Sequence, residues 1–323
     1  MTLEEPTITV AMPAYNAERY IGRAIESILS QTVTDLELVI VEDRSTDETW
    51  RIINEYAASD PRIRVFRNEV NSGAAASSNR AISEARAPII AGMDADDISL
   101  PHRIETQLAM LRNHPEIAVV GSFVSHTNDA DEVLSLSRTG PTTVAEFEKL
   151  RRTGEPTMVF GGTAMYTKEL FDRVGGFDAK LRAAADIEFC DRMAEHGPII
   201  AIPEPLLLYR VYSSSNVMLR FREGRLTHRF LEARRSAQLA GEPLPTREEY
   251  AATEANLSWW RRLNIRRDDF SQYWYRQGGL AFADGRKVWT GVYLVMAAIA
   301  GPFHALRRIW DQRLSPAARR ARR

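Results

Sequence analysis

The sequence predicts an α/β protein, with a mostly parallel sheet flanked by helices and a helical C-terminal extension. In the first 124 residues, short β-branched and apolar runs alternate with segments whose apolar residues recur at helical spacing. The strand segments are largely apolar on both faces, which is typical of parallel strands covered by helices. From about residue 216 onward, strand signals become sparse and long charged helical segments replace them.

Five strands are expected in this part of the chain, at residues 7–12, 36–41, 63–66, 89–93 and 119–124. Helices should follow the first four strands. Asn16 is expected to cap the first helix, and the polar run 45–48 to begin the second. The turn 71–73 leads into a third helix. Pro101 should stand in the first turn of the fourth, where proline is tolerated.

The bulk composition is that of an ordinary globular protein. Of 323 residues, 44% are hydrophobic, and a net charge of −1 gives no global field that would attract nucleic acid. We therefore expect no nucleic-acid partner. The single cysteine, Cys190, rules out an internal disulfide framework. The start of the sequence lacks a basic-then-apolar signal, so we expect a cytoplasmic protein.

Polar clusters occupy the expected carboxyl ends of three strands, at residues 13–16, 42–45 and 94–97. Parallel sheets bind ligands beyond these ends, so the three clusters should share one rim. The last cluster places Asp94, Asp96 and Asp97 within four positions, where like charges repel. A divalent cation would relieve this repulsion, and carboxylates suit Mg²⁺ or Mn²⁺. The alternative is a polar turn that caps the next helix.

Several familiar motifs of α/β enzymes are missing. No Gly-x-Gly-x-x-Gly follows the first strand, which argues against an NAD-type site. The sequence has neither a Walker A lysine loop nor a Gly-x-Ser-x-Gly elbow, which lowers the odds of a P-loop enzyme or an α/β-hydrolase.

The motifs that are present resemble those of the inverting family 2 glycosyltransferases. The resemblance rests on TVAMPAYNAERYIGRAIESILSQT, LELVIVEDRSTDET, NSGAAASSNRAI, MDADDISLPHRIETQ and VGGFDAKLRAAADIEFCDRM, in that order. It implies a GT-A fold with a Rossmann-like sheet and a catalytic domain over residues 1–215. Within that domain, a nucleotide-sugar half would span about 1–124 and an acceptor half about 125–215. A helical region, 216–312, and a basic, disordered tail, 313–323, would follow.

The resemblance also implies a role for individual residues. Asp186 would be the general base, and Asp96 would bind the metal. The residues in contact with the nucleotide would be Pro13, Ala14, Tyr15, Glu42, Asp43 and Asp94. Supporting roles would fall to Asp97, Glu188 and Arg80. Simpler readings stay open: Tyr15 and Asp43 could serve as caps, and an acid such as Asp186 also suits a helix N-terminus.

The sequence departs from the family pattern at several positions. Ala185 precedes the expected base where an acid is common, and Glu188 stands where Asp is usual. Glu42 replaces a commoner Asp. The family often has a His after the Tyr-Arg pair, but Val211 stands there, so a His metal ligand at that point has no support. The glycine-containing run 161–164 would border the acceptor pocket or form a plain turn.

The resemblance implies a metal-dependent inverting glycosyltransferase of the hexosyltransferase type. Such an enzyme would use Mn²⁺ or Mg²⁺ and move a sugar from a UDP- or dTDP-linked donor to a hydroxyl of a glycan or lipid-linked acceptor, in polysaccharide or glycolipid synthesis at the cell envelope. Two alternatives stay open. One is a nucleotide-sugar-binding module without catalysis. The other is a sugar-1-phosphate nucleotidyltransferase, although its Gly-rich, Lys-bearing loop is missing after Met12.

The C-terminal region contains an apolar segment, 288–299, that is too short for a comfortable span of about 20 residues. Apolar character resumes over 303–310, and basic residues flank both pieces. A peripheral membrane contact through 286–310, at the inner face of the cell membrane, is one interpretation. A helical hairpin that packs on the protein itself or on another subunit of a homo-oligomer is the other.

Overall fold

The computed structural model describes residues 5–212, 216–283 and 285–301, and the chain divides into two compact units, Met1–Arg210 and Val211–Arg323. In the described ranges, every strand belongs to the first unit. Its strands are β1 (Ile8–Ala14), β2 (Leu36–Glu42), β3 (Ile63–Arg67), β4 (Ile89–Gly92), β5 (Ile98–Ser99), β6 (Val119–Thr127), β7 (Val133–Ser137), β8 (Met165–Thr167) and β9 (Ile199–Arg210). Its helices are α1 (Ile21–Leu29), α2 (Thr49–Ser59), α3 (Ala74–Ser83), α4 (Arg103–Asn113), α5 (Val144–Thr153), α6 (Lys168–Val174) and α7 (Ala185–Met193), with a 3₁₀ turn, η1, at Gly161–Thr163.

The strands form one sheet in the order β3-β2-β1-β4-β8-β6-β9-β5, and β7 pairs with β6. The strands β1 to β4 are mutually parallel, as predicted. Beyond β4 the sheet becomes mixed, because β8 runs antiparallel to both β4 and β6 while β9 runs parallel to β6. The antiparallel pairs involve β5, β7 and β8, short strands that the sequence pattern did not predict.

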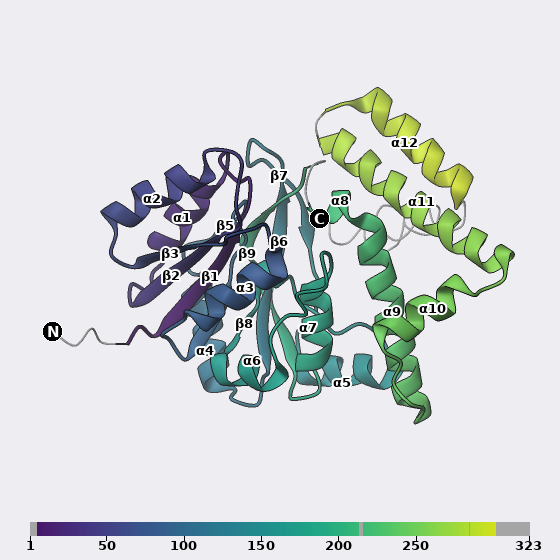
Figure 1. The fold of residues 1–323 in the computed structure, drawn as a ribbon, viewed down its shortest axis with the longest axis horizontal. Coiled ribbons are helices and arrows are strands. Elements are labelled where there is room, and N and C mark those ends of the chain that lie inside the picture. The colour runs from purple at the N-terminus through teal and green to yellow at the C-terminus, as the bar shows by residue number, and fades with distance from the viewer. Residues whose placement is uncertain (1–4, 213–215, 284, 302–323) are drawn as a thin grey trace. The chain divides into compact units, whose positions relative to one another are not determined.

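Helices cover both faces of the parallel half of the sheet (Figure 1). The chain moves from β1 to β2 to β3 in one direction, so right-handed crossovers place α1 and α2 on the same face, where they pack together. The return from β3 to β4 places α3 on the other face, against β1 and β2. All seven residues of β2 are buried, which explains the continuous apolar run at residues 38–41.

The predicted helix starts at the rim were wrong in detail. Helix α1 begins at Ile21, and the Asn16 Oδ1 instead accepts a 2.9 Å hydrogen bond from the Thr46 amide. The Ser45 Oγ accepts from the Asn16 amide at 3.0 Å, and α2 begins only at Thr49. Bonds between the two loops replace local caps here. Both loops are therefore longer than predicted, and they hold each other at the edge of the sheet.

The second unit is helical, as predicted. It contains α8 (Asn216–Leu219), α9 (Phe221–Ala240), α10 (Arg247–Ala255), α11 (Trp259–Ala283) and α12 (Lys287–Ala300). None of the helices in the described part of the chain combines the length and apolar character that a membrane crossing needs. The predicted contact region 286–310 is described only as far as Gly301, and the predicted tail 313–323 lies outside the described residues.

Candidate active site

The three polar clusters lie at one edge of the sheet, as their strand ends predicted. Ala14 at the end of β1 is in register with Glu42 at the end of β2. The Met93 amide, just past β4, donates to the Ala11 carbonyl of β1 at 3.1 Å. The Asp43 amide donates to Ala14 at 2.8 Å. Strand pairing therefore brings the segments after β1, β2 and β4 together.

The acidic run after β4 concentrates negative charge at this edge. Asp97 is buried, its Oδ1 accepts from the Arg210 amide at 2.9 Å, and its Oδ2 has no hydrogen-bond partner among the described residues. Burial, then Asp96 and Asp94, raise the pKa of Asp97 well above its ordinary value. Burial, then Asp96 and Asp186, raise the pKa of Asp94 to about 7. Asp94 and Asp96 keep part of their surface accessible, so a ligand could reach them.

Two arginines that the sequence analysis did not single out support this run. Arg103, in the first turn of α4, is fully buried and donates to the Gly92 carbonyl at 2.5 Å. Burial lowers the pKa of Arg103 to about 10, although Asp97 and Asp94 oppose that shift. Arg210, at the end of β9, donates to the Asp96 carbonyl at 3.0 Å. Only the fold shows that both side chains reach this edge, since β9 was not predicted.

Asp186 joins the same site from the first turn of α7. Burial raises its pKa, and the amides of Ile187, Asp186 itself and Gly161 oppose that shift by hydrogen bonding. The charge of Asp186 in turn raises the pKa of Asp94, so the two carboxylates are close enough to interact. Asp186 is partly exposed. A carboxylate with a raised pKa, at a ligand-accessible edge, is suited to accept a proton.

A glycine pair in η1 allows this close arrangement. A Cβ at Gly161 would lie 2.8 Å from the Asp186 Cβ, and a Cβ at Gly162 would lie 3.0 Å from the Asp94 Oδ2. Both distances are shorter than an ordinary carbon contact. The backbone of η1 therefore passes directly beside two of the carboxylates, and any side chain at position 161 would displace the Asp186 side chain.

Glu42 and Asp43 organise the loops on the predicted nucleotide side. Glu42 is fully buried; its Oε2 accepts from Arg67 Nε at 2.7 Å, and its Oε1 accepts from the Ser45 amide. Asp43 is also buried and accepts from the Ser72 amide at 2.8 Å and the Gly73 amide at 2.7 Å. These bonds hold the loop that leads into α3 against the end of β2.

The other predicted site residues differ in how they are engaged. Tyr15 is 49% exposed at the rim, beside the partly buried Pro13 and the buried Ala14. Arg80 donates to the Arg67 carbonyl and to Asn68 Oδ1, both at 2.7 Å, and so holds the end of β3. Tyr15 therefore presents an aromatic ring to solvent, whereas Arg80 acts on the backbone beneath the rim.

Glu188 supports the helix that carries Asp186. Its two carboxylate oxygens accept from Arg192 Nε at 2.6 Å and from the second guanidinium nitrogen at 2.7 Å. Arg192 also donates to the carbonyls of Val174 and Gly176, at 2.8 and 2.7 Å. Glu188 therefore orients Arg192, and Arg192 ties α7 to the end of α6 and the loop that follows it.

An aromatic cluster borders the carboxylates. The rings of Phe160 and Tyr209 lie 5.4 Å apart, and the rings of His126 and Tyr209 lie 5.6 Å apart, between centroids. Each of the three side chains is partly exposed. Burial, then Asp97, raise the pKa of Tyr209, and burial lowers the pKa of His126. No sequence pattern predicts this cluster, because its members come from three distant segments.

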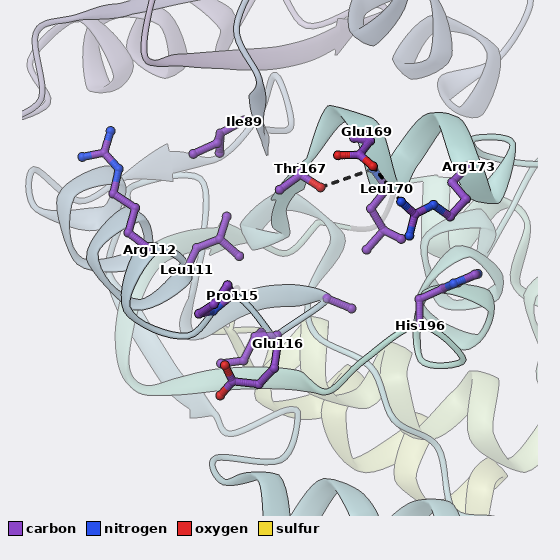
Figure 2. A pocket seen from close by; sticks show the side chains of 12 residues that line it. Ile89, Leu111, Arg112, Pro115, Glu116, Thr167, Glu169, Leu170, Arg173 and His196 are labelled. Carbon is purple, nitrogen blue, oxygen red and sulfur yellow. Dashed lines mark hydrogen bonds and ion pairs between the residues drawn. The ribbon is translucent and has the colours of Figure 1, made fainter.

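A cavity of ≈ 330 Å³ lies at the opposite end of the strands (Figure 2). Ile89, the first residue of β4, lines it, together with Thr167 at the end of β8. Figure 2 shows Arg173 and Glu169 on one side of this cavity, where they form a 2.6 Å ion pair. The cavity is separate from the carboxylates, which lie past the carboxyl end of β4.

The residues present fit a divalent cation. Within the described ranges, no three His, Cys, Asp or Glu side chains are arranged to hold a metal by themselves. Mg²⁺ and Mn²⁺ sites that also hold substrate phosphates need only one or two carboxylates from the protein. Asp94 and Asp96 are hard oxygen donors at an edge with excess negative charge, and the Asp97 Oδ2 beside them has no hydrogen-bond partner among the described residues.

Relatives of known name share this sequence pattern. The family model "Glycosyl transferase family 2" matches residues 9–175. Chondroitin synthase of Escherichia coli is 32% identical over 60% of this chain, and an uncharacterized glycosyltransferase of Methanocaldococcus jannaschii is 32% identical over 69%. The match covers 27% of the first protein and 77% of the second, so the chain spans well under two thirds of some relatives it matches.

Solved structures with low identity share the fold. TarS 1–349 of S. aureus in complex with UDP-GlcNAc has a TM-score of 0.56 at 17% identity, covering 91% of each chain. The mannosyltransferase PcManGT of Pyrobaculum calidifontis, in complex with GDP-Man and Mn²⁺, has a TM-score of 0.54 at 20% identity, covering 93% of this chain and 88% of its own. By family match and by fold, the chain belongs to glycosyl transferase family 2 and has the GT-A architecture.

Proposed function

We propose that this protein is an inverting glycosyltransferase that moves a sugar from a nucleotide-diphosphate sugar to an acceptor hydroxyl. The observation that carries the proposal is the convergence of Asp186 with the Asp94–Asp97 run across the glycines of η1. This arrangement supports a proton acceptor at Asp186 beside a site suited to a cation and a diphosphate. Family membership supports the same class of reaction.

The donor nucleotide would lie over the ends of β1 and β2. Tyr15 offers an exposed ring there, with Pro13 and Ala14 beside it, and Asp43 would face the base once the loop of Ser72 and Gly73 adjusts. Glu42 acts through the loops it holds, because Arg67 and the Ser45 amide occupy its oxygens. We propose that the donor carries uracil or thymine as its base, as a UDP- or dTDP-linked sugar. The UDP-GlcNAc and GDP-Man complexes of the two structural neighbours support the nucleotide-sugar class without selecting a base.

Asp96 would hold a Mn²⁺ or Mg²⁺ ion, and Asp94 would face the sugar and ribose of the donor. When bound, such an ion would neutralise the charge that develops on the leaving diphosphate. Arg210 holds the Asp96 backbone, Arg103 holds the Gly92 backbone, and Asp97 anchors the run to β9 through the Arg210 amide. These contacts keep the carboxylates in place before the donor arrives.

Asp186 would act as the general base. It takes the proton of the acceptor hydroxyl as that oxygen forms a bond to the anomeric carbon. The bond from the anomeric carbon to the diphosphate oxygen breaks on the opposite face, so the configuration inverts through an oxocarbenium-like transition state. The amides near Asp186 limit the rise of its pKa by hydrogen bonding, which favours the ionised carboxylate that accepts a proton.

The acceptor would enter beside Asp186, where Phe160, Tyr209 and His126 form a partly exposed aromatic wall. Aromatic faces pack well against the C–H faces of sugar rings through burial of apolar surface. A glycan or lipid-linked acceptor in polysaccharide or glycolipid synthesis fits such a wall. The relative named chondroitin synthase supports this class of acceptor.

Measuring which phosphate product appears tests this function. The protein is first screened by thermal shift against UDP-, dTDP- and GDP-sugars with and without Mn²⁺, and the stabilising donor is then incubated with candidate acceptors. Transfer predicts nucleoside diphosphate as a product. Pyrophosphate would instead indicate a nucleotidyltransferase. Tight donor binding with no diphosphate release above that of Asp186→Asn, across all acceptors, would favour a binding module and overturn the proposal.

A further inference from the structure

One face of α12 carries an unbroken apolar ridge, which we define as Val288, Val292, Val295 and Ile299. Their spacing of four, three and four residues places them on one side of the helix. They are 78%, 42%, 58% and 76% exposed, respectively. Trp289, beside the ridge, is 54% exposed. Isolated exposed apolar residues are common, but a continuous row on one helix face indicates a binding surface.

The ridge is not needed for the packing of α12 on its neighbour. The face of α12 that meets α11 uses other residues: Ser271 Oγ donates to the Ala297 carbonyl at 2.9 Å, and Trp274 stacks on Tyr293 with centroids 5.1 Å apart. Ala297 is fully buried in this contact. The ridge therefore points away from α11, and the packing between α11 and α12 does not use it.

Positive charge bounds the ridge at both ends. Arg286 and Lys287 are exposed where α12 begins. Arg267 of α11 is exposed and donates to the Ala300 carbonyl at 3.2 Å, where α12 ends. No charged residue occurs between positions 288 and 301. The sequence that continues past Gly301 adds seven arginines and one aspartate. An apolar strip with cationic ends matches an anionic surface that has an apolar interior.

We propose that the ridge docks in the surface of an anionic phospholipid bilayer, with α12 lying in the membrane plane. The helix of 14 residues is about 21 Å long, which suits an interfacial position but not a span of about 20 residues. Trp289 would sit at the headgroup level, where indole rings are favoured. A second copy of this chain is a poorer occupant, because antiparallel pairing of two ridges would bring Arg286 and Lys287 of one copy toward Arg267 of the other.

The test is co-sedimentation of the full chain with vesicles of phosphatidylcholine alone or with 30% phosphatidylglycerol. We expect binding to the anionic vesicles at least tenfold tighter than to the neutral ones, and weaker binding at high salt. Val295→Asp should weaken it at least tenfold, and Lys287→Gln about fivefold. Leu239→Asp, at a residue 54% exposed on α9, is the matched control and should leave binding within twofold.

Thermal unfolding first shows that each variant folds, which we expect because all the substituted side chains are exposed. Failure of the wild-type chain to bind anionic vesicles would overturn the inference, as would equal losses in Val295→Asp and Leu239→Asp. A lipid-free dimer that Val295→Asp dissociates, without vesicle binding, would assign the ridge to a self-interface instead. None of these outcomes depends on the sugar-transfer reaction, so they leave the proposed function untouched.

Discussion

Adding one methyl group at position 161 should disable catalysis while sparing the donor site. In Gly161→Ala the new Cβ would lie 2.8 Å from the Asp186 Cβ and 3.0 Å from its Oδ2. To restore an ordinary contact of at least about 3.5 Å, the Asp186 side chain must move by roughly 0.7 Å. Since a misplacement of about 1 Å can lower a rate about 100-fold, we expect kcat to fall about 10- to 100-fold. This equals about 1.4–2.8 kcal/mol of transition-state stabilisation.

The assay for this variant combines nucleoside diphosphate release with nucleotide binding by calorimetry. Nucleotide affinity should stay within about threefold, because the three atoms nearest the added Cβ all belong to Asp186. Gly279→Ala is the control: it lies in α11 with no atom within 4 Å of the added Cβ, so it should leave kcat unchanged and add up to about 1 kcal/mol of stability. Wild-type kcat in Gly161→Ala would refute the placement of Asp186 against η1.

Three other perturbations probe the base, the metal and the helical unit. Asp186→Asn should lower kcat about 10²- to 10⁴-fold with nearly unchanged nucleotide affinity. The wild-type kcat should fall as pH drops through the raised pKa of Asp186, because only the ionised carboxylate accepts a proton. A pH-independent kcat would argue against Asp186 as the general base. Asp96→Ala should abolish the Mn²⁺-dependent gain in nucleotide affinity, and a gain that persists and is still removed by chelator would place the metal elsewhere. Burial, then Arg225, lower the pKa of His228 to about 4, so the unfolded chain binds the proton first as pH falls. The free energy of unfolding should therefore fall by up to about 3 kcal/mol from pH 7 to pH 4. Urea titrations of His228→Gln should lack this loss, and the same dependence of stability on pH in the variant would contradict the assignment.

The parallel half of the fold was predictable because its signals are local. β2 is apolar at five of its seven positions, and β1 through β4 occur in the order that a right-handed βαβ pattern requires. The strands β5 and β8 are only two and three residues long, too short to show any periodicity. β9 is interrupted by Glu204 between two prolines and shifts register against β6, which hides its alternation.

The candidate site divides in the same way. Asp94, Asp96 and Asp186 are visible in the sequence because each belongs to a short motif of fixed spacing. Arg103 was not singled out because a buried arginine inside a helix looks like any helical charge until its partner, the Gly92 carbonyl, is known. The aromatic cluster of His126, Phe160 and Tyr209 was missed because those residues belong to three separate segments.

The sequence by itself determined the class of fold, the edge of the sheet where the site lies, and the carboxylates that could carry its chemistry. Periodicity and motif spacing are local properties, so a linear pattern is enough to predict them. The tertiary structure decided which charges meet. It brings Asp186 against Gly161 and forms the hydrogen bond between the Arg210 amide and Asp97. It also leaves four apolar residues of α12 exposed on the face away from α11. Burial and distance set the pKa values and the exposed surfaces, and both depend on contacts between segments that are remote in the sequence.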